Sequence, residues 1–408
     1  MRSLIRLEAS CTLRSMAQEA RSSSRPAPKS VLVKPTSAAC NLACRYCFYR
    51  SRPSDPYRHQ RTQTMSPEVL ASLIAQHLRL SESAAAFGWQ GGEPTLAGLD
   101  FFRQAVSFQS RYGSSGQVVS NALQTNGILL DAEWARFLRR YQFLVGVSLD
   151  GPAEVHDPWR VDLNGGPTFE QVMESLRILR RYRVATNVLA VVHHLNWQHV
   201  EQTLDFFVSQ RLHYLQFVPA IDRLPDGRLT EYSLRPAEYA DFLCRLFDAW
   251  YGRGQPEVSV RLFDNLVSVA AGLGNEMCEF GARCDSYYVV EFNGDVYPCD
   301  FFVTESLRLG NLRQQPLREI LDSEQRQSFA AARESLPPAC QACQWEGICH
   351  GGCLRYRFAA GGDLLSMSYM CQPTRTLLQH AWPRIERLAG ALRPDSQPLA
   401  AAWPSRHP

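Results

Sequence analysis

The chain has 408 residues, of which 45% are apolar and 20% are charged, and its formal net charge is +3. This composition is typical of a globular enzyme large enough for two or three domains, and the near-neutral charge gives no electrostatic case for binding nucleic acid. Since no apolar run approaches the ~18 residues of a membrane span, we expect no membrane association.

The first segment, residues 1–28, is rich in Arg, Ser and Ala and ends in a proline-containing stretch. We expect a disordered extension, although an Arg- and Ser-rich start is also typical of a transit peptide. Cys11 lies in this segment and has no partner at the spacing of metal ligands.

A β-branched run at 31–36 predicts a strand, and Cys40, Cys44 and Cys47 follow it in a C-x3-C-x2-C spacing. Thiolates bind soft metals, and a structural zinc site would need four such ligands. A cubane iron–sulfur cluster held by three thiolates keeps one iron open for a substrate, whereas electron-transfer clusters have four. The spacing therefore favours an open cluster, with a zinc loop or three buried thiols as alternatives.

From residue 31 to about 256 the chain alternates strand-like and helix-like segments. The predicted strands are 31–36, 84–90, 118–125, 143–149, 185–193 and 213–219. The predicted helices are 66–80, 100–112, 131–141, 168–182, 197–209 and 236–252, the first with Ser66 as N-cap and Pro67 behind it. Six such units predict an α/β fold with a parallel sheet covered by helices, but the pattern does not distinguish a flat sheet from a curved barrel.

Several motifs follow directly after these strands. They are Gln90-Gly91-Gly92-Glu93-Pro94-Thr95, Gln124-Thr125-Asn126-Gly127, Val147-Ser148-Leu149-Asp150-Gly151-Pro152 with Arg160 beyond it, and Phe217-Val218-Pro219-Ala220-Ile221-Asp222. Glycines permit close approach of backbone to a ligand, a carboxylate can accept from an ammonium, and a guanidinium can bind a carboxylate through two hydrogen bonds. Each motif alone is also compatible with an ordinary turn.

Cysteines return after about residue 275. They are Cys278, Cys284, Cys299, Cys340, Cys343, Cys349, Cys353 and Cys371. Eight thiolates can complete two four-thiolate clusters or two zinc sites. The stretch 288–297 predicts a hairpin with an Asn-Gly turn, which would bring Cys284 and Cys299 together. The spacing does not decide how the eight are divided.

The thirteen cysteines, clustered at short spacings, indicate metal ligation in a reducing compartment, and we expect a cytoplasmic protein. Three, four and four ligands leave Cys11 and Cys244; we expect Cys244, on a predicted helix, to be a small buried apolar residue. His193, His194 and His199 have no cysteine or carboxylate at ligand spacing, so we expect surface or structural roles. Residues after about 393 predict a loose tail.

Taken together, the Cys40–Tyr49 loop, Gln90–Pro94, Ser148–Pro152 and the later cysteines resemble the anaerobic sulfatase-maturating enzymes over about residues 31 to 385. These belong to the radical S-adenosylmethionine (SAM) superfamily and carry a SPASM domain. The resemblance implies a partial (β/α)6 barrel at 29–260. It also implies a SPASM domain at 261–392, with a β-hairpin, a C-terminal helix and two auxiliary clusters.

The resemblance also implies three [4Fe–4S] clusters. The first is bound by Cys40, Cys44 and Cys47. A crossed pairing gives the first auxiliary cluster to Cys278, Cys284, Cys299 and Cys353, and the second to Cys340, Cys343, Cys349 and Cys371. The implied SAM-binding residues are Tyr46, Gly91, Gly92, Glu93, Ser148, Arg160 and Ile221, and the implied substrate contacts are Tyr49 and Gln90. Asp300 is the implied catalytic base, with a turn cap as the alternative.

The implied reaction oxidises an active-site Cys or Ser of a sulfatase, within a Cys/Ser-x-Pro/Ala-x-Arg segment, to Cα-formylglycine through a 5′-deoxyadenosyl radical. A flavodoxin or ferredoxin is an expected electron donor. One alternative is another SPASM-type maturase that forms a thioether or carbon–carbon crosslink in a ribosomal peptide. A zinc-stabilised interaction protein is an alternative from a different class.

Overall fold

The computed structural model describes residues 28–51, 54–60, 63–81, 83–224, 226–359, 363 and 365–392. The predicted N-terminal extension, apart from residue 28, and the predicted tail lie outside these residues. No helix in the described part of the chain is long and apolar enough to cross a membrane.

The described residues form one sheet of ten strands in the order β10-β9-β8-β1-β2-β3-β4-β5-β6-β7. The strands are β1 (Ser30–Lys34), β2 (Ala84–Trp89), β3 (Val118–Thr125), β4 (Leu144–Ser148), β5 (Ala185–Val192), β6 (Tyr214–Pro219), β7 (Ser259–Val260), β8 (Tyr287–Glu291), β9 (Asp295–Tyr297) and β10 (Gly310–Asn311). All pairings from β8 through β1 to β7 are parallel, and β9 runs antiparallel to β8 and β10. The six predicted strands and the hairpin are confirmed.

The predicted helices are also confirmed, each within three residues of its expected bounds. They are α3 (Pro67–Leu80), α4 (Leu99–Tyr112), α5 (Ala132–Arg140), α7 (Phe169–Arg181), α8 (Val200–Ser209) and α9 (Pro236–Tyr251). At the start of α3 the Ser66 hydroxyl accepts from the amide of Val69 at 3.4 Å, which satisfies one of the amides that a helix start leaves open.

The remaining helices are shorter or lie nearer the C-terminus. The α-helices are α2 (Phe48–Ser51), α6 (Ala153–His156), α10 (Arg261–Ala270), α11 (Leu317–Asp322), α12 (Glu324–Ala331), α13 (Pro338–Gln341), α14 (Glu346–Cys349), α15 (Leu354–Ala359) and α16 (Cys371–Leu392). The 3₁₀ helices are η1 (Pro94–Ala97), η2 (Cys278–Phe280), η3 (Asp300–Phe302), η4 (Glu305–Leu307) and η5 (Ala332–Glu334).

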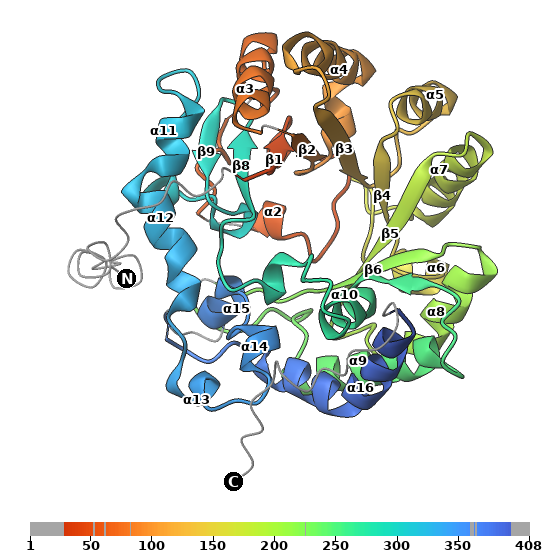
Figure 1. Cartoon of the computed structure of the whole chain (residues 1–408). Helices are drawn as coiled ribbons and strands as arrows, with labels where there is room; N and C mark the ends of the chain where they lie inside the picture. The colour runs from red at the N-terminus through yellow and green to blue at the C-terminus, as the bar shows by residue number, and fades with distance from the viewer. Residues whose placement is uncertain are drawn as a thin grey trace.

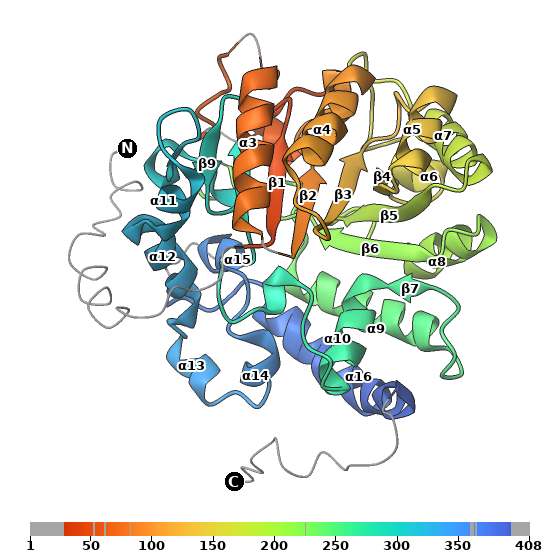
Figure 2. The same ribbon diagram turned by 45° about the horizontal axis from the view of Figure 1, so that its top comes forward.

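The sheet is curved into an open arc, with α3, α4, α5 and α7 along its outer side (Figure 1). The C-terminal part of the chain spans both ends of that arc, because the hairpin pairs with β1 while α16 packs on α9 and α10 near β7 (Figure 2). The α/β fold with a partial barrel, followed by antiparallel strands and a C-terminal helix, is therefore confirmed. One sheet crosses residue 260, so the division into domains there stays a prediction.

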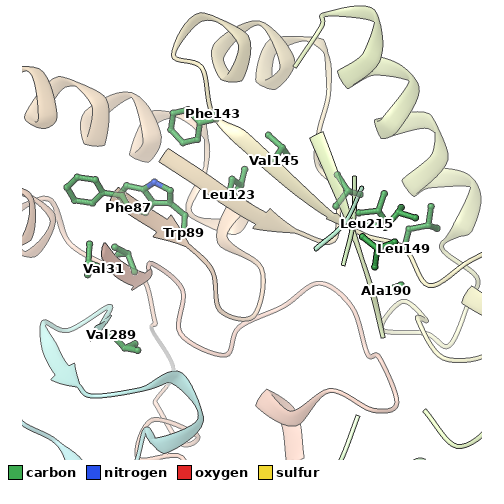
Figure 3. Close-up of a cluster of buried hydrophobic side chains, with 14 of the residues drawn as sticks. Val31, Phe87, Trp89, Leu123, Phe143, Val145, Leu149, Ala190, Leu215 and Val289 are labelled. Atoms are coloured by element: carbon green, nitrogen blue, oxygen red, sulfur yellow. The ribbon is translucent and has the colours of Figure 1, made fainter. Parts of the chain in front are cut away.

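The core lies mainly between the sheet and the outer helices. The side chains of Phe87, Trp89 and Leu123 are at most 1% exposed, and Figure 3 shows these residues on neighbouring strands. Burial of such side chains contributes about 1.5–3 kcal/mol each, and it fixes the strands whose C-terminal ends carry the motifs.

Candidate metal centres and substrate site

The loop with the first three cysteines is fixed to the segment that follows β4. The amides of Ala43 and Arg45 donate to the carbonyls of Val161 and Trp159 at 2.8 and 2.9 Å. Cys44 and Cys47 lie close enough to Cys40 for their charges to act on its thiol. Desolvation raises the pKa of Cys40 to about 12 and that of Cys44 to about 11. The thiols are therefore neutral on their own, and their thiolate forms require a strongly bound cationic group.

The donor set fits a multi-iron cluster better than a single ion. The twelve cysteines in the described residues form no disulfide. Among the same residues, no three His, Cys, Asp or Glu side chains stand close enough to share one metal ion. A zinc ion needs sulfurs at about 2.3 Å from its centre, whereas a cubane spreads its ligands further apart. The side-chain nitrogen Nδ2 of Asn126 also lies 3.7 Å from Cys40 Sγ.

The two glycines after β2 are required by the neighbouring backbone. Gly91 has φ +145°, and a Cβ there would lie 2.6 Å from the carbonyl of Ser37. A Cβ on Gly92 would lie 2.1 Å from the carbonyl of Ala39. The amide of Gly92 donates to Ser37 at 2.7 Å. The close approach is thus to the segment leading into the cysteine loop, and it ties β2 to that loop.

The side chain of Glu93 is the centre of a buried hydrogen-bond network. Its Oε1 accepts from the hydroxyls of Thr95 and Thr125 at 2.6 and 2.8 Å, and from the amide of Thr95 at 3.0 Å. Its Oε2 accepts from the amide of Asn126 at 2.7 Å. Burial raises the pKa of Glu93, while these hydrogen bonds oppose the rise. The carboxylate holds the ends of β2 and β3 together, and its contact with an ammonium stays a prediction.

Tyr46 and Arg160 meet at Asp150, a residue to which the sequence assigned no role. The Tyr46 hydroxyl donates to Asp150 Oδ2, and Arg160 Nε lies 3.0 Å from Oδ1. Burial acts to raise the pKa of Asp150, but the charge of Arg160, together with His156 and the hydrogen bonds from Tyr46 and Val191, outweighs burial and the pKa is lowered. The buried His193 ring lies 4.4 Å from Trp159 in the same cluster, and its expected structural role stays a prediction.

Ser148 and Ile221 lie at the ends of β4 and β6. The Ser148 hydroxyl accepts from Gln124 Nε2 at 3.2 Å. The carbonyl of Ile221 accepts from Nη2 of Arg355 at 3.1 Å, and the Arg355 guanidinium lies 3.9 Å from the ring centroid of Phe301. Arg355 thereby joins the barrel to the C-terminal region, although nothing in the sequence distinguished it from a surface arginine.

Tyr49, Gln90 and Asp300 come together from three distant parts of the chain. The Tyr49 hydroxyl donates to Asp300 Oδ2 at 2.5 Å, and Gln90 Nε2 donates to the Tyr49 oxygen at 3.4 Å. The ammonium of Lys34 lies 2.6 Å from Asp300 Oδ1 and 3.4 Å from Glu291 Oε1. Lys34 and Glu291 are directly paired across β1 and β8, and both are within 2% of full burial. Sequence reasoning missed this pair.

The later cysteines fall into two groups by the charges that each thiol feels. Cys278, Cys284 and Cys299 are each influenced by Cys353. Cys340 and Cys349 are influenced by Cys371 and Cys343. Desolvation is the largest cause in every case, and it raises the pKa of Cys278 to about 12 and that of Cys284 to about 11. The Tyr287 hydroxyl lies 3.3 Å from Cys299 Sγ.

The remaining residues singled out in the sequence stand apart from these groups. His194 contacts Glu238 at 2.9 Å, and His199 contacts Gln202 at 3.0 Å. These are structural contacts, as expected. Cys244 is half-buried rather than buried, so the expectation of a buried apolar residue is not met in full.

Comparison with known protein families gives two matches. Residues 35–207 match the radical SAM superfamily, and residues 278–344 match the SPASM family, described as an iron–sulfur cluster-binding domain. The chain is 36% identical over 369 residues to a cysteine-type anaerobic sulfatase-maturating enzyme of Clostridium perfringens, covering 90% of this chain and 100% of that one. It is 33% identical over 389 residues to a serine-type enzyme of Bacteroides thetaiotaomicron, covering 91% and 94%.

Solved structures give a consistent result. The structure of native anSMEcpe with bound AdoMet and the Cp18Cys peptide is similar with a TM-score of 0.82 and 36% identity, covering 89% of this chain and 99% of that one. Streptococcus suis SuiB bound to its precursor peptide SuiA is similar with a TM-score of 0.62 and 15% identity, covering 85% and 76%. The second likeness concerns the fold alone.

Proposed function

The chain belongs to the anaerobic sulfatase-maturating enzymes, which are radical SAM proteins with a SPASM domain, and from this membership we propose which of its residues carry out each part of the reaction. The enzyme oxidises a cysteine or serine of a sulfatase to formylglycine by radical SAM chemistry. It uses SAM and iron–sulfur clusters and binds sulfatase-derived peptides.

Cys40, Cys44 and Cys47 bind the cluster that SAM contacts. When bound there, SAM supplies the radical that removes a hydrogen atom from Cβ of the target residue. The backbone of Gly91 and Gly92, with Glu93 holding it in place, binds the amino group, and Arg160 binds the carboxylate. Tyr46 positions Arg160 through Asp150, while Ser148 binds the ribose and the backbone of Ile221 meets the adenine. The location of these groups at the ends of neighbouring strands supports the assignment.

Asp300 is the general base that takes the thiol or hydroxyl proton of the target residue. The contacts that Asp300 makes with Lys34 and Tyr49 are the observation that carries this proposal. The Lys34 ammonium stabilises negative charge on the carboxylate, so the base is ready to accept a proton. The Tyr49 hydroxyl fixes one oxygen, and Asp300 follows Cys299, a ligand of the first auxiliary cluster.

Tyr49 and Gln90 contact the sulfatase segment. A substrate that enters beside Tyr49 meets the base within the same hydrogen-bond network, which supports this placement. Alignment of the target atom with its base accounts for a large part of the rate in such reactions.

Three [4Fe–4S] clusters are proposed in total. The first auxiliary cluster is held by Cys278, Cys284, Cys299 and Cys353, and the second by Cys340, Cys343, Cys349 and Cys371. The mutual influence of the thiols within each set supports the crossed pairing. A flavodoxin or ferredoxin supplies the electron for SAM cleavage, and the absence of disulfides among the described cysteines supports a reducing compartment such as the cytoplasm.

The test is an oxygen-free incubation of the enzyme with SAM, a reductant and a sulfatase-motif peptide in Cys and Ser forms. Mass spectrometry is expected to show loss of two hydrogen atoms from the Ser form. The Cys form is expected to exchange its sulfur for oxygen as well. A thioether or carbon–carbon crosslink in place of the aldehyde would overturn the proposal and support a peptide-crosslinking enzyme.

A further inference from the structure

Arg333 is buried between the two sets of auxiliary cysteines. Its side chain is 1% exposed, and its Nη1 donates to the carbonyl of Cys278 at 2.5 Å. Its Nη2 donates to the carbonyls of Glu279 and Cys349, the latter at 3.5 Å. One guanidinium therefore holds backbone from the first set, at Cys278, and from the second set, at Cys349.

Arg333 forms no direct ion pair within the described residues, although its charge acts on Glu279. The adjacent Glu334 pairs with Arg283 instead. Within the described residues, Nε of Arg333 also has no hydrogen-bond partner.

A buried cation in such a setting is expensive unless negative charge lies nearby. The thiols of both sets supply that charge. Because Arg333 contacts the carbonyls of Cys278 and Cys349, thiolates that bind a cluster in either set lie near its positive charge. A four-iron cluster held by four thiolates keeps a net negative charge, because its ligands carry more charge than its core neutralises.

We infer that Arg333 is a positioning residue shared by the two auxiliary clusters, whose buried positive charge offsets the negative charge of both. This inference rests on the proposed assignment of the eight cysteines to two clusters. Arg357 supports the arrangement, since it is fully buried and donates to the carbonyls of Arg333 and Gly351 at 3.2 and 3.1 Å. Arg357 thereby holds Arg333 against the loop between Cys349 and Cys353.

The consequence concerns the second electron of the reaction. Reduction adds negative charge to a cluster, so a nearby cation favours the reduced form. Arg333 raises the reduction potential of both auxiliary clusters and makes each a better acceptor for the electron that leaves the substrate. The first cluster lies beside Arg160 instead, the cation whose charge acts most on Cys44.

The experiment is a redox titration followed by electron paramagnetic resonance on the full-length holoenzyme. The variants are Arg333→Gln and Arg333→Lys. Replacing Cys40, Cys44 and Cys47 by Ala in parallel samples removes the signal of the first cluster. In Arg333→Gln we expect the one-electron reduction equilibrium of each auxiliary cluster to weaken at least tenfold, which is about 59 mV. Arg333→Lys keeps the charge and is expected to remain near the wild-type potentials.

Arg326 provides a matched control. It is 2% exposed, donates to the carbonyl of Asp285 at 3.3 Å, and has Cys284 as the cysteine whose charge acts on it. Arg326→Gln is therefore expected to lower the potential of one auxiliary cluster and leave the other unchanged. In all of these variants the potential of the first cluster is expected to stay at its wild-type value.

Several outcomes would overturn the inference. One is an Arg333→Gln enzyme with full iron content in which either auxiliary potential is unchanged, and another is an equal shift of all three clusters. If Arg333→Gln fails to bind iron, the result with Arg333→Lys is decisive. Normal iron content in Arg333→Lys supports the role of charge, and failure of both variants to bind iron contradicts it. Wild-type enzyme with fewer than about 12 irons per chain would instead overturn the proposed cluster assignment. The potentials do not depend on whether formylglycine forms.

Discussion

The Tyr49 hydroxyl donates a 2.5 Å hydrogen bond to Oδ2 of Asp300, residues that lie 251 positions apart in the chain. This contact joins α2, at the end of the cysteine loop, to the segment that leaves the hairpin. Because Asp300 follows Cys299 directly, the proposed base is held to both the first cluster loop and an auxiliary cluster loop. Cleavage of SAM at the first cluster and proton removal by Asp300 can therefore be tested separately.

Asp300→Asn is expected to keep its clusters and to cleave SAM, since none of the proposed ligands or SAM contacts changes. Formylglycine formation is expected to fall by about 10²–10⁴-fold, the usual contribution of a general base. Iron content, 5′-deoxyadenosine release and aldehyde yield should be measured on the same sample. Wild-type aldehyde yield in this variant would remove Asp300 from the role.

Lys34→Met should weaken both folding and catalysis. The change leaves the buried carboxylate of Asp300 without its ammonium partner, and breaking a buried ion pair in this way costs about 3–5 kcal/mol. The matched control is Glu291→Gln. Burial raises the pKa of Glu291 and favours its neutral form, so we expect the amide to cost about 1 kcal/mol or less. Urea unfolding compares the two, and equal losses of stability would contradict the prediction.

Gly92→Ala is expected to displace the first cysteine loop. The added Cβ would meet the carbonyl of Ala39 at 2.1 Å, and backbone cannot yield there without moving Cys40. We expect loss of the first cluster and of SAM cleavage, with both auxiliary clusters retained. Gly390→Ala, in α16 with nothing within 4 Å of its Cβ position, should leave all clusters intact and stabilise the helix by up to about 1 kcal/mol.

Paired cysteine variants test how the eight ligands are divided. Cys278→Ala with Cys353→Ala removes two ligands of the same proposed cluster, so it should lose no more iron than either change alone. Cys340→Ala with Cys353→Ala removes one ligand from each cluster and should lose both. Iron and sulfide analysis gives the answer directly. If Cys278 and Cys353 belonged to different clusters, their double variant would lose more iron than either change alone.

Stability is expected to fall as the pH drops below about 6.5. Burial lowers the pKa of His77 to about 4 from its ordinary 6.5, so between these values the unfolded chain takes up a proton that the folded protein does not. The native state therefore loses stability on acidification, by about 2 kcal/mol between pH 7 and pH 5 for this residue. His77→Gln is expected to remove that part of the slope in urea unfolding. An unchanged slope would show that His77 is not buried in its neutral form.

Much of the fold could be predicted because its signals are local. The six strand–helix units follow from periodicity, the Asn293-Gly294 turn indicates the hairpin, and cysteine spacing indicates the clusters. The parallel pairing of β1 with β8 could not be predicted, since strands 250 residues apart carry no mark of their pairing. In the sequence, Lys34 is only the last residue of an apolar strand. Its pairing with Glu291 can be recognised only from the structure, where the two strands are neighbours.

The site was predicted less completely, for a related reason. Motif residues identified the loops, but they did not indicate which side chains serve the ligand and which hold the loops. Glu93 accepts hydrogen bonds from Thr95, Thr125 and Asn126, a network that no spacing rule describes. No sequence pattern marks Arg333 as buried, because the backbone that covers it includes Cys278 and Cys349, which are distant from it in the chain.

The pairing of β1 with β8 also has a consequence for protein engineering. Truncating the chain after residue 260 would remove β8, the hydrogen-bonding neighbour on one side of β1. β1 would then be an exposed edge strand, which favours self-association. The region after residue 260 thus extends the sheet of the barrel. If this region is exchanged for that of a relative, the new hairpin must pair with β1 in the same register.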